Sequence, residues 1–213
     1  MIPVATIFTV FEIMGTVAFA ISGAMEAVRH KMDVFGVAMM GLVAAAGGGV
    51  IRDMIIGATP PAVFRHPEHA ALAVCVALVV FVLLHCWHNK NDGGIHRFAH
   101  IYERIYFLSD TLGLAVFTMV GIEAAGEADG ALLLFVGVVT GVGGGVLRDV
   151  LAGTVPRIFR KNVYALASAA GAVANILLAK ILPAQLAMII GFSVVVVIRL
   201  LANHFNWNLP RIE

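Results

Sequence analysis

The chain has 213 residues, of which 61% are hydrophobic and 13% charged, and its mean hydropathy is +0.96. Soluble domains carry about 25% charged residues, so this chain has too little polar surface for a water-facing globule, and its hydrophobicity excludes disorder. The net charge of +1 argues against nucleic acid as a partner, because phosphate contacts need a basic excess. The composition therefore predicts a membrane protein surrounded by lipids.

Seven segments have the length and hydrophobicity of transmembrane helices. A helix needs about 20 apolar residues to cross about 30 Å of hydrocarbon. In chain order, the predicted spans are residues 4–28, 34–57, 69–87, 105–124, 131–153, 163–182 and 185–203. The sequence therefore predicts an all-α membrane protein, and its longest polar connection, residues 88–104, leaves no room for a soluble domain.

Lysine and arginine residues indicate the orientation, because cytoplasmic loops accumulate them. Arg65 and Lys180 lie in the loops on one side of the predicted membrane. The loops after the first, third and fifth spans and the C-terminal tail, on the other side, carry nine basic residues: Arg29, Lys31, Lys90, Arg97, Arg104, Arg157, Arg160, Lys161 and Arg211. We therefore expect a multi-pass membrane protein with its N-terminus outside and its C-terminus in the cytoplasm. Arg52, Arg148 and Arg199 fall within spans or at their ends and need separate explanations.

The chain contains an internal repeat. Residues 47–53 read Gly-Gly-Gly-Val-Ile-Arg-Asp and residues 143–149 read Gly-Gly-Gly-Val-Leu-Arg-Asp, and aligning 41–57 with 137–153 gives nine identities in 17 positions. Each repeat, 4–88 and 104–183, contains three predicted spans. Because three is odd, the second repeat must enter the membrane from the opposite side, which is a recurrent transporter architecture. The predicted seventh helix, 185–203, lies outside these two inverted three-helix repeats.

The glycine triplets lie near the middle of their predicted spans. From Val34 to Ala46 is 13 residues, or about 20 Å of helix. Each glycine costs about 1 kcal/mol of helix preference relative to alanine. A kink or break at each triplet would line a cavity or a binding site with exposed backbone groups. The alternative is that the glycines only allow two helices to pack closely.

An arginine and an aspartate follow each triplet, as Arg52 with Asp53 and Arg148 with Asp149. Neighbouring side chains point about 100° apart on a helix, so each pair is expected to find partners on other helices. The repeat aligns two carboxylates of the first spans, Glu12 and Asp110, which are the predicted partners. These ions either line an aqueous path or form a buried network that holds the bundle together.

The sequence contains no catalytic constellation, so we do not expect an enzyme. The serines of the spans have no Gly-x-Ser-x-Gly motif, and the glycines do not form a phosphate-binding loop. His85, His88, His96 and His100 gather around one connection, but their spacing matches no familiar zinc site, so we expect neither a metal nor a cofactor.

The paired Gly-Gly-Gly-Val-(Ile/Leu)-Arg-Asp motif in a chain with seven predicted spans resembles the prokaryotic trimeric intracellular cation (TRIC) channel family. The same bacterial sequences are also grouped as a glycine-transporter domain that occurs twice per chain. The resemblance implies a seven-helix fold, a homotrimer, and a pore in each protomer lined by the second and fifth spans. By the same resemblance, these two spans would be kinked at Gly47, Gly48 and Gly49, and at Gly143, Gly144 and Gly145.

Two functions remain open on this basis. The first is a channel for monovalent cations, with K⁺ expected, in which backbone carbonyls and carboxylates coordinate the ion. The second is a carrier for glycine or a similar zwitterion, with arginine and helix N-termini receiving the carboxylate. Both hypotheses use the same candidate pore or solute-binding residues: Glu12, Gly47, Gly48, Gly49, Arg52, Asp53, Asp110, Gly143, Gly144, Gly145, Arg148 and Asp149.

Overall fold

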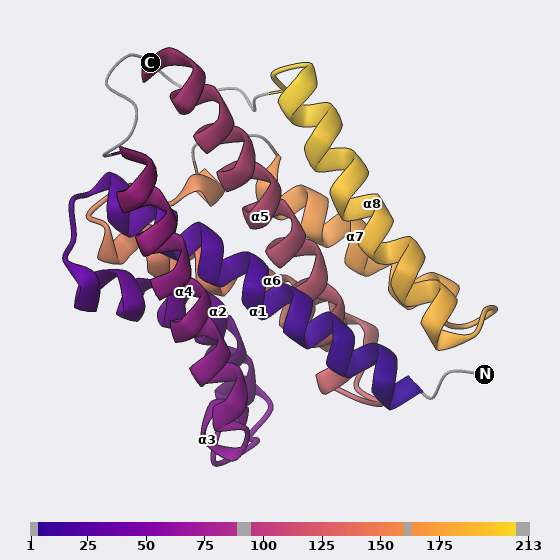
Figure 1. Cartoon of the computed structure of the whole chain (residues 1–213). Helices are drawn as coiled ribbons and strands as arrows, with labels where there is room; N and C mark the ends of the chain where they lie inside the picture. The colour runs from indigo at the N-terminus through magenta and orange to yellow at the C-terminus, as the bar shows by residue number, and fades with distance from the viewer. Residues whose placement is uncertain (1–3, 89–94, 160–162, 208–213) are drawn as a thin grey trace.

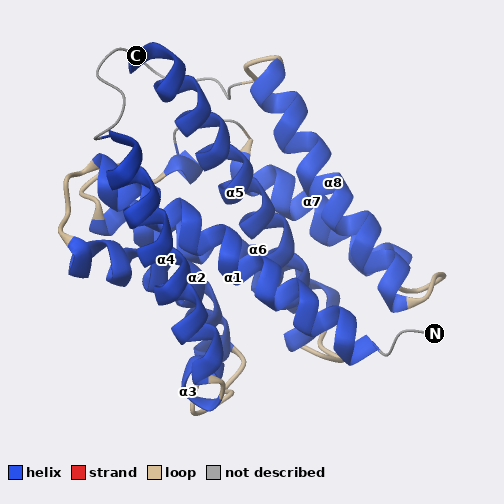
Figure 2. Ribbon diagram, viewed as in Figure 1, coloured by secondary structure: helices blue, strands red, loops and turns tan. Residues whose placement is uncertain are grey.

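The computed structural model describes residues 4–88, 95–159 and 163–207, and this part of the chain is built from helices and connecting turns (Figures 1 and 2). In chain order the helices are α1 (Val4–Arg29), α2 (Val34–Ile55), α3 (Ala62–Arg65), α4 (Pro67–His88), α5 (Ile95–Ala124), α6 (Gly130–Leu151), the 3₁₀ helix η1 (Arg157–Phe159), α7 (Tyr164–Leu178) and α8 (Ala184–His204). The two short helices, α3 and η1, were not predicted from the sequence.

Six of the seven predicted spans are helices long and apolar enough to cross a membrane, namely α1, α2, α4, α5, α6 and α8. The seventh, α7, has 15 residues, or about 22 Å at 1.5 Å per residue. It is shorter than the predicted span 163–182, because the helix ends at Leu178 and the chain turns there toward α8, which follows Pro183. Over the residues that the structure describes, the chain is thus an all-helical membrane protein with six candidate spans and one shorter apolar helix.

Four helices form the centre of the bundle. Helix α1 packs against α2 and α5, and α6 packs against α5 and α2. Helix α4 covers α1 and α2, while α7 and α8 lie together against the other side, with α8 also contacting α5 (Figure 1). The central helices α2 and α6, which carry the glycine triplets, are therefore direct neighbours.

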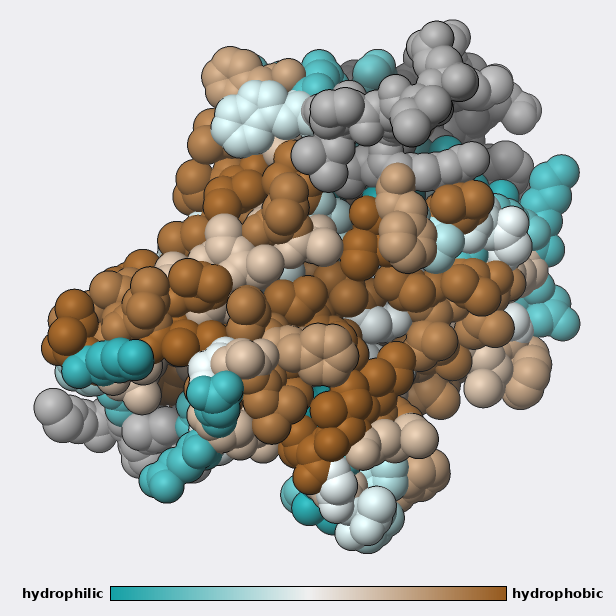
Figure 3. All heavy atoms as spheres, turned by 180° about the vertical axis from the view of Figure 1, so that it is seen from behind, coloured by the Kyte–Doolittle hydropathy of each residue, from teal (hydrophilic) through white to brown (hydrophobic). Residues whose placement is uncertain are grey.

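The surface of the bundle is largely apolar. Figure 3 shows a broad hydrophobic area across the middle of one face, with hydrophilic side chains gathered toward its margins. The outer helix α4 is mostly unburied and exposes Val79, Val82 and Leu83. Soluble monomers rarely expose apolar areas of this extent, so the surface agrees with a protein embedded in lipid.

Helices α2 and α6 begin and end alike. Each has 22 residues and begins after an aspartate, Asp33 or Asp129, whose side chain accepts a hydrogen bond from the first turn. Each is followed by a glycine with positive φ, Gly57 at 72° and Gly153 at 69°, a conformation that side chains with a Cβ rarely adopt. The two repeats therefore share local geometry as well as sequence. Their opposite orientation stays a prediction.

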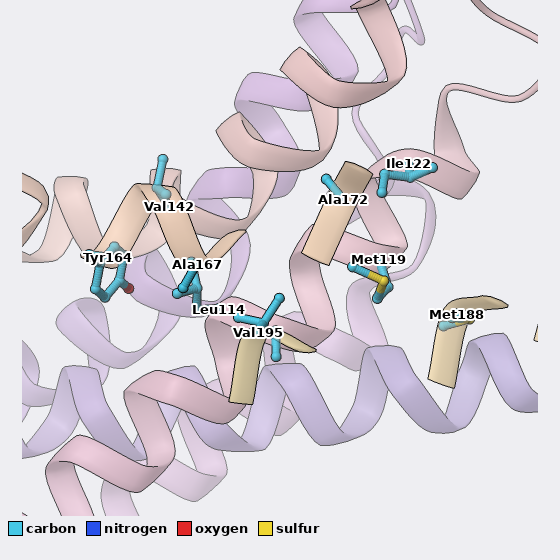
Figure 4. Close-up of a cluster of buried hydrophobic side chains, with 10 residues drawn as sticks. Leu114, Met119, Ile122, Val142, Tyr164, Ala167, Ala172, Met188 and Val195 are labelled. Carbon is cyan, nitrogen blue, oxygen red and sulfur yellow. The ribbon is translucent and has the colours of Figure 1, made fainter. Parts of the chain in front are cut away.

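A hydrophobic cluster joins α8 to the second repeat. Figure 4 shows Leu114 and Met119 of α5, Tyr164 of α7, and Met188 and Val195 of α8 among the side chains that gather there. Lipid is about as apolar as these side chains, so the cluster stabilises the bundle through close contacts rather than through removal from water. Helix α8, which has no counterpart in the first repeat, therefore closes one side of the second repeat.

Candidate functional site

Arg148 lies at the centre of a buried ionic cluster. Its guanidinium Nε and Nη2 donate hydrogen bonds to Oδ1 of the adjacent Asp149, at 2.9 and 2.8 Å. Its Nη1 donates to Oδ1 of Asp110 on α5, at 2.8 Å, and to Oγ of Ser22 on α1, at 2.9 Å. Arg148 has no exposed surface. A charge at this depth is costly unless it is paired, and the cluster pairs it from three helices.

Asp110 binds a second arginine and a tyrosine. Nη2 of Arg199, on α8, lies 3.3 Å from Oδ2 of Asp110. The hydroxyl of Tyr164, on α7, donates to Oδ1 at 3.3 Å. The predicted pairing of Asp110 with Arg148 is thus present, within a cluster that connects α1, α5, α6, α7 and α8.

Arg52 of α2 makes the same bonds to its neighbour that Arg148 makes. Its Nε and Nη2 both lie 2.8 Å from Oδ1 of Asp53. The sequence-based expectation that the neighbouring residues would not pair is therefore wrong for both repeats. The 100° separation applies to the directions of the Cβ atoms, whereas the long arginine side chain is able to fold back to the next carboxylate.

The predicted partner of Arg52, Glu12, lies near it without an ion pair. Among the described residues, no carboxylate oxygen of Glu12 lies within 4.0 Å of the Arg52 guanidinium. Both side chains instead line a recess of about 60 Å³, together with Thr16, Asp53 and His69. One water molecule needs about 10–15 Å³ of such space, so the recess has room for several water molecules. Arg52 and Asp53 thus border a space for water, whereas Arg148 and Asp110 have no exposed surface.

The second oxygen of each aspartate holds the loop that follows its helix. Oδ2 of Asp53 accepts a hydrogen bond from the backbone N–H of Ala62, at 2.6 Å, and Oδ2 of Asp149 accepts one from Arg157, at 2.9 Å. Each Arg-Asp pair therefore fixes the end of its helix to the short helix α3 or η1. The repeat places Ala62 and Arg157 at equivalent positions.

The sequence predicted a kink or a break at each glycine triplet. Both triplets lie inside continuous α-helix, so the helices are not broken there, and the kink stays a prediction. A Cβ at Gly48 would overlap the carbonyl oxygen of Thr140, and a Cβ at Gly144 would overlap that of Ala44. A Cβ at Gly143 would lie 3.1 Å from Cα of Gly48. The backbones of α2 and α6 therefore touch where the triplets cross, which is the close packing considered as the alternative.

The outer glycines of the triplets have different neighbours. Gly47 lies against the side chain of Leu147. The nearest atom to a Cβ at Gly49 would be Nη2 of Arg52, at 3.8 Å, and a Cβ at Gly145 would lie 3.6 Å from Nη2 of Arg148. The third glycine of each triplet thus makes room for the guanidinium three residues later.

Three members of the α6 cluster were not assigned from the sequence: Ser22, Tyr164 and Arg199. The position of Arg199 within a predicted span was a signal, since an intramembrane charge requires a partner. Tyr164 occupies the position that aligns with His69 when Pro156 is matched to Pro61, so the repeat could have identified it. Nothing in the sequence distinguishes Ser22 from the other small residues of α1.

Comparisons with known proteins identify the family. A family model described as Glycine transporter matches the chain twice, over residues 9–85 and 107–180. The Escherichia coli K12 inner membrane protein YadS is 35% identical over 203 residues, which are 93% of each chain. The structure of a TRIC channel orthologue from Rhodobacter sphaeroides is 30% identical, with a TM-score of 0.83 over 95% of this chain and 100% of that one. The chain belongs to the prokaryotic TRIC channel family.

Two further TRIC structures have the same fold. One, solved to explain conductance through TRIC cation channels, is 32% identical with a TM-score of 0.82 and covers 97% of each chain. The other, a prokaryotic TRIC channel in 0.5 M KCl, is 25% identical with a TM-score of 0.85 and covers 96% of this chain and all of that one. The family predicted from the paired motif is confirmed.

Proposed function

We propose that this protein is a homotrimeric inner-membrane channel that passes monovalent cations, chiefly K⁺, through a pathway within each protomer. The observation that carries the proposal is the likeness over nearly the whole chain to solved TRIC cation channels, at 30–32% identity and TM-scores of 0.82–0.83. Two internal ionic sites beside α2 and α6 supply the polar groups that such a pathway needs.

The charge balance along the proposed pathway favours cations. Among the described residues, five buried or partly buried carboxylates lie in or next to the two ionic sites: Glu12, Glu26, Asp53, Asp110 and Asp149. Four arginines accompany them: Arg52, Arg148, Arg157 and Arg199. The excess of one negative charge raises the local concentration of cations relative to anions.

The contact at the triplets implies that the pathway is closed in this conformation. Because the backbones of α2 and α6 touch near Gly48 and Gly144, no solute fits between the helices at that level. Conduction requires the crossing to separate. The same glycines that allow the contact also leave little side-chain packing to be broken when the helices move apart.

Purified protein in liposomes provides the test. We expect K⁺ flux that a membrane potential drives, that does not saturate at millimolar K⁺, and that exceeds the uptake of radiolabelled glycine by orders of magnitude. A Gly144→Leu variant provides the control for leak through damaged bilayers. Saturable glycine uptake without K⁺ flux would overturn the proposal.

A carrier for glycine is the second candidate, favoured by the description of the matching family model and by the recess of the first repeat. There Arg52 offers a guanidinium for the carboxylate of the solute and Glu12 a carboxylate for its ammonium group. Under this hypothesis Glu12→Gln raises the KM for glycine, whereas in a channel it changes cation selectivity.

We also propose that the N-terminus faces outward and the C-terminus faces the cytoplasm. The start of α1 and the end of α8 lie at opposite ends of the bundle (Figure 1). Basic residues Arg29, Lys31 and Arg104 lie toward the end of the bundle at which α8 ends. This distribution supports a cytoplasmic location for that end. The recess with Glu12 then opens toward the outside.

A further inference from the structure

The two repeats differ where the second ionic site meets the surface. Matching Pro156 to Pro61 pairs Arg157 with Ala62, and both backbone N–H groups bind the aspartate of their own repeat. Matching Asp110 to Glu12 pairs Glu26 of α1 with Ala124 of α5. Glu26 of the first repeat and Arg157 of the second are thus charged residues whose counterparts in the other repeat are alanines. The two charged side chains lie next to each other. Nη2 of Arg157 lies 3.6 Å from Oε2 of Glu26.

Arg157 covers the inner part of the α6 site. Its guanidinium carbon lies 3.8 Å from the centre of the Tyr106 ring, in a cation–π contact. Tyr106 is 1% exposed, and the guanidinium carbon of Arg148 lies 5.1 Å from the centre of the same ring. On its outer side Arg157 lines a cavity of about 270 Å³ with Arg104, Arg199 and others. Arg157 thus lines this cavity and covers Tyr106, and neither Tyr106 nor Arg148 is among the cavity's lining residues.

Glu26 has fewer partners than its burial requires. Its side chain is 6% exposed, and no hydrogen bond reaches Oε2 among the residues described. Two basic groups lie at 3.6 Å, beyond hydrogen-bond distance: Nδ1 of His30 from Oε1, and Nη2 of Arg157 from Oε2. The His30 ring nitrogen is 2.9 Å from the backbone carbonyl of Glu26, so it is already engaged. A buried carboxylate with a free lone pair is a ligand for a cation.

We propose that Glu26 and the face of Tyr106 form a monovalent-cation site at the inner end of the pathway, and that the Arg157 guanidinium occupies this site as a tethered cation. While Arg157 stays in place, the site is filled and the cavity is closed off from Arg148. When it moves aside, the carboxylate and the ring face receive K⁺, and the cavity becomes continuous with the α6 site. This inference rests on the proposed function for the identity of the cation.

The test uses the accessibility of a cysteine behind Arg157. Ser22→Cys, which replaces the hydroxyl bonded to Arg148, is placed in a Cys75→Ser, Cys86→Ser background, and inverted membrane vesicles are treated with a small cationic methanethiosulfonate. We expect Arg157→Ala to speed labelling of this cysteine about tenfold, the factor that corresponds to about 1.4 kcal/mol of lost Arg157 contacts. Arg104→Ala, which removes another arginine of the same cavity, provides the control and should label at the parent rate.

Competition with K⁺ tests the cation site itself. In the Arg157→Ala protein, K⁺ should slow labelling relative to N-methylglucamine, and adding Glu26→Gln should abolish the protection. Labelling that Arg157→Ala does not change, or protection by K⁺ that survives Glu26→Gln, would overturn the inference.

Two safeguards keep the test decisive. If Arg157→Ala does not fold, Arg157→Gln replaces it, because this variant keeps the methylene groups over Tyr106 and removes only the charge. Labelling does not depend on conduction. If K⁺ protects the cysteine as expected but vesicles carry no K⁺ current, the channel proposal fails while the cation site at Glu26 is supported.

Discussion

Replacing Arg148 and Arg52 separately with glutamine provides an internal comparison between the two repeats. Both variants remove the same charge at the same position of the repeat. Arg148 has no exposed surface and binds Asp149, Asp110 and Ser22. Arg52 binds Asp53 and borders the recess that has room for water. We expect Arg148→Gln to destabilise the fold more than Arg52→Gln.

The expected magnitudes follow from these surroundings. Removing one partner of a buried ion pair costs about 3–5 kcal/mol, and Arg148→Gln leaves Asp110 with the more distant Arg199. Removing hydrogen bonds to a charged group that water still reaches costs about 1.5–3 kcal/mol, which applies to Arg52→Gln. For a protein of this size, 1 kcal/mol shifts the melting temperature by roughly 2–4 °C. Arg148→Gln should therefore lower it by roughly 6–20 °C, about twice the effect of Arg52→Gln.

The assay is thermal unfolding of the purified variants in one detergent, followed by the loss of the folded peak in size-exclusion chromatography. Arg52→Lys and Arg148→Lys, which keep the charge, separate the loss of charge from the loss of the two-pronged guanidinium contact. Equal melting temperatures for the two glutamine variants, or a larger loss for Arg52→Gln, would refute the inference that Arg148 is shielded from water and Arg52 is hydrated.

Three further predictions concern the crossing, the cluster and the topology. Gly144→Leu should abolish K⁺ flux and destabilise the crossing in a melting assay, whereas Gly130→Leu, which meets no atom within 4 Å, should do neither. Tyr164→Phe should lower the stability by about 1.5–3 kcal/mol in chemical denaturation, because it removes one hydrogen bond to a buried carboxylate. In intact cells, an impermeant thiol reagent should label a cysteine at Glu127 and not one at Asn91; the reverse pattern would invert the proposed orientation.

Much of the fold was predictable because hydrophobic length dominates in membrane proteins. The spans containing Arg52 and Arg148 end within about two residues of α2 and α6, since each leads into a glycine that ends the helix. Helix α7 was predicted too long, because hydrophobicity continues past Leu178 although the chain turns there. Such a turn depends on packing against α8, which composition does not report.

The internal repeat allowed part of the ionic sites to be predicted. Aligning Glu12 with Asp110 located one carboxylate correctly beside Arg148, but its counterpart does not reach Arg52. The pairing of each arginine with its neighbour was missed because helical direction was applied to a flexible side chain. The glycines were expected to kink or break their helices, since an isolated helix would lose stability there. The opposing backbone that compensates for them lies 96 residues away, for example where Gly48 meets Gly144.

Unitary currents of the purified protein in a planar bilayer test the central claim most directly. With KCl at different concentrations on the two sides, we expect discrete current steps whose reversal potential follows the K⁺ gradient, and their loss with Gly144→Leu. A wild-type protein that gives no unitary current under these conditions, but takes up radiolabelled glycine with saturation in liposomes of the same preparation, would contradict the claim that this chain is a cation channel.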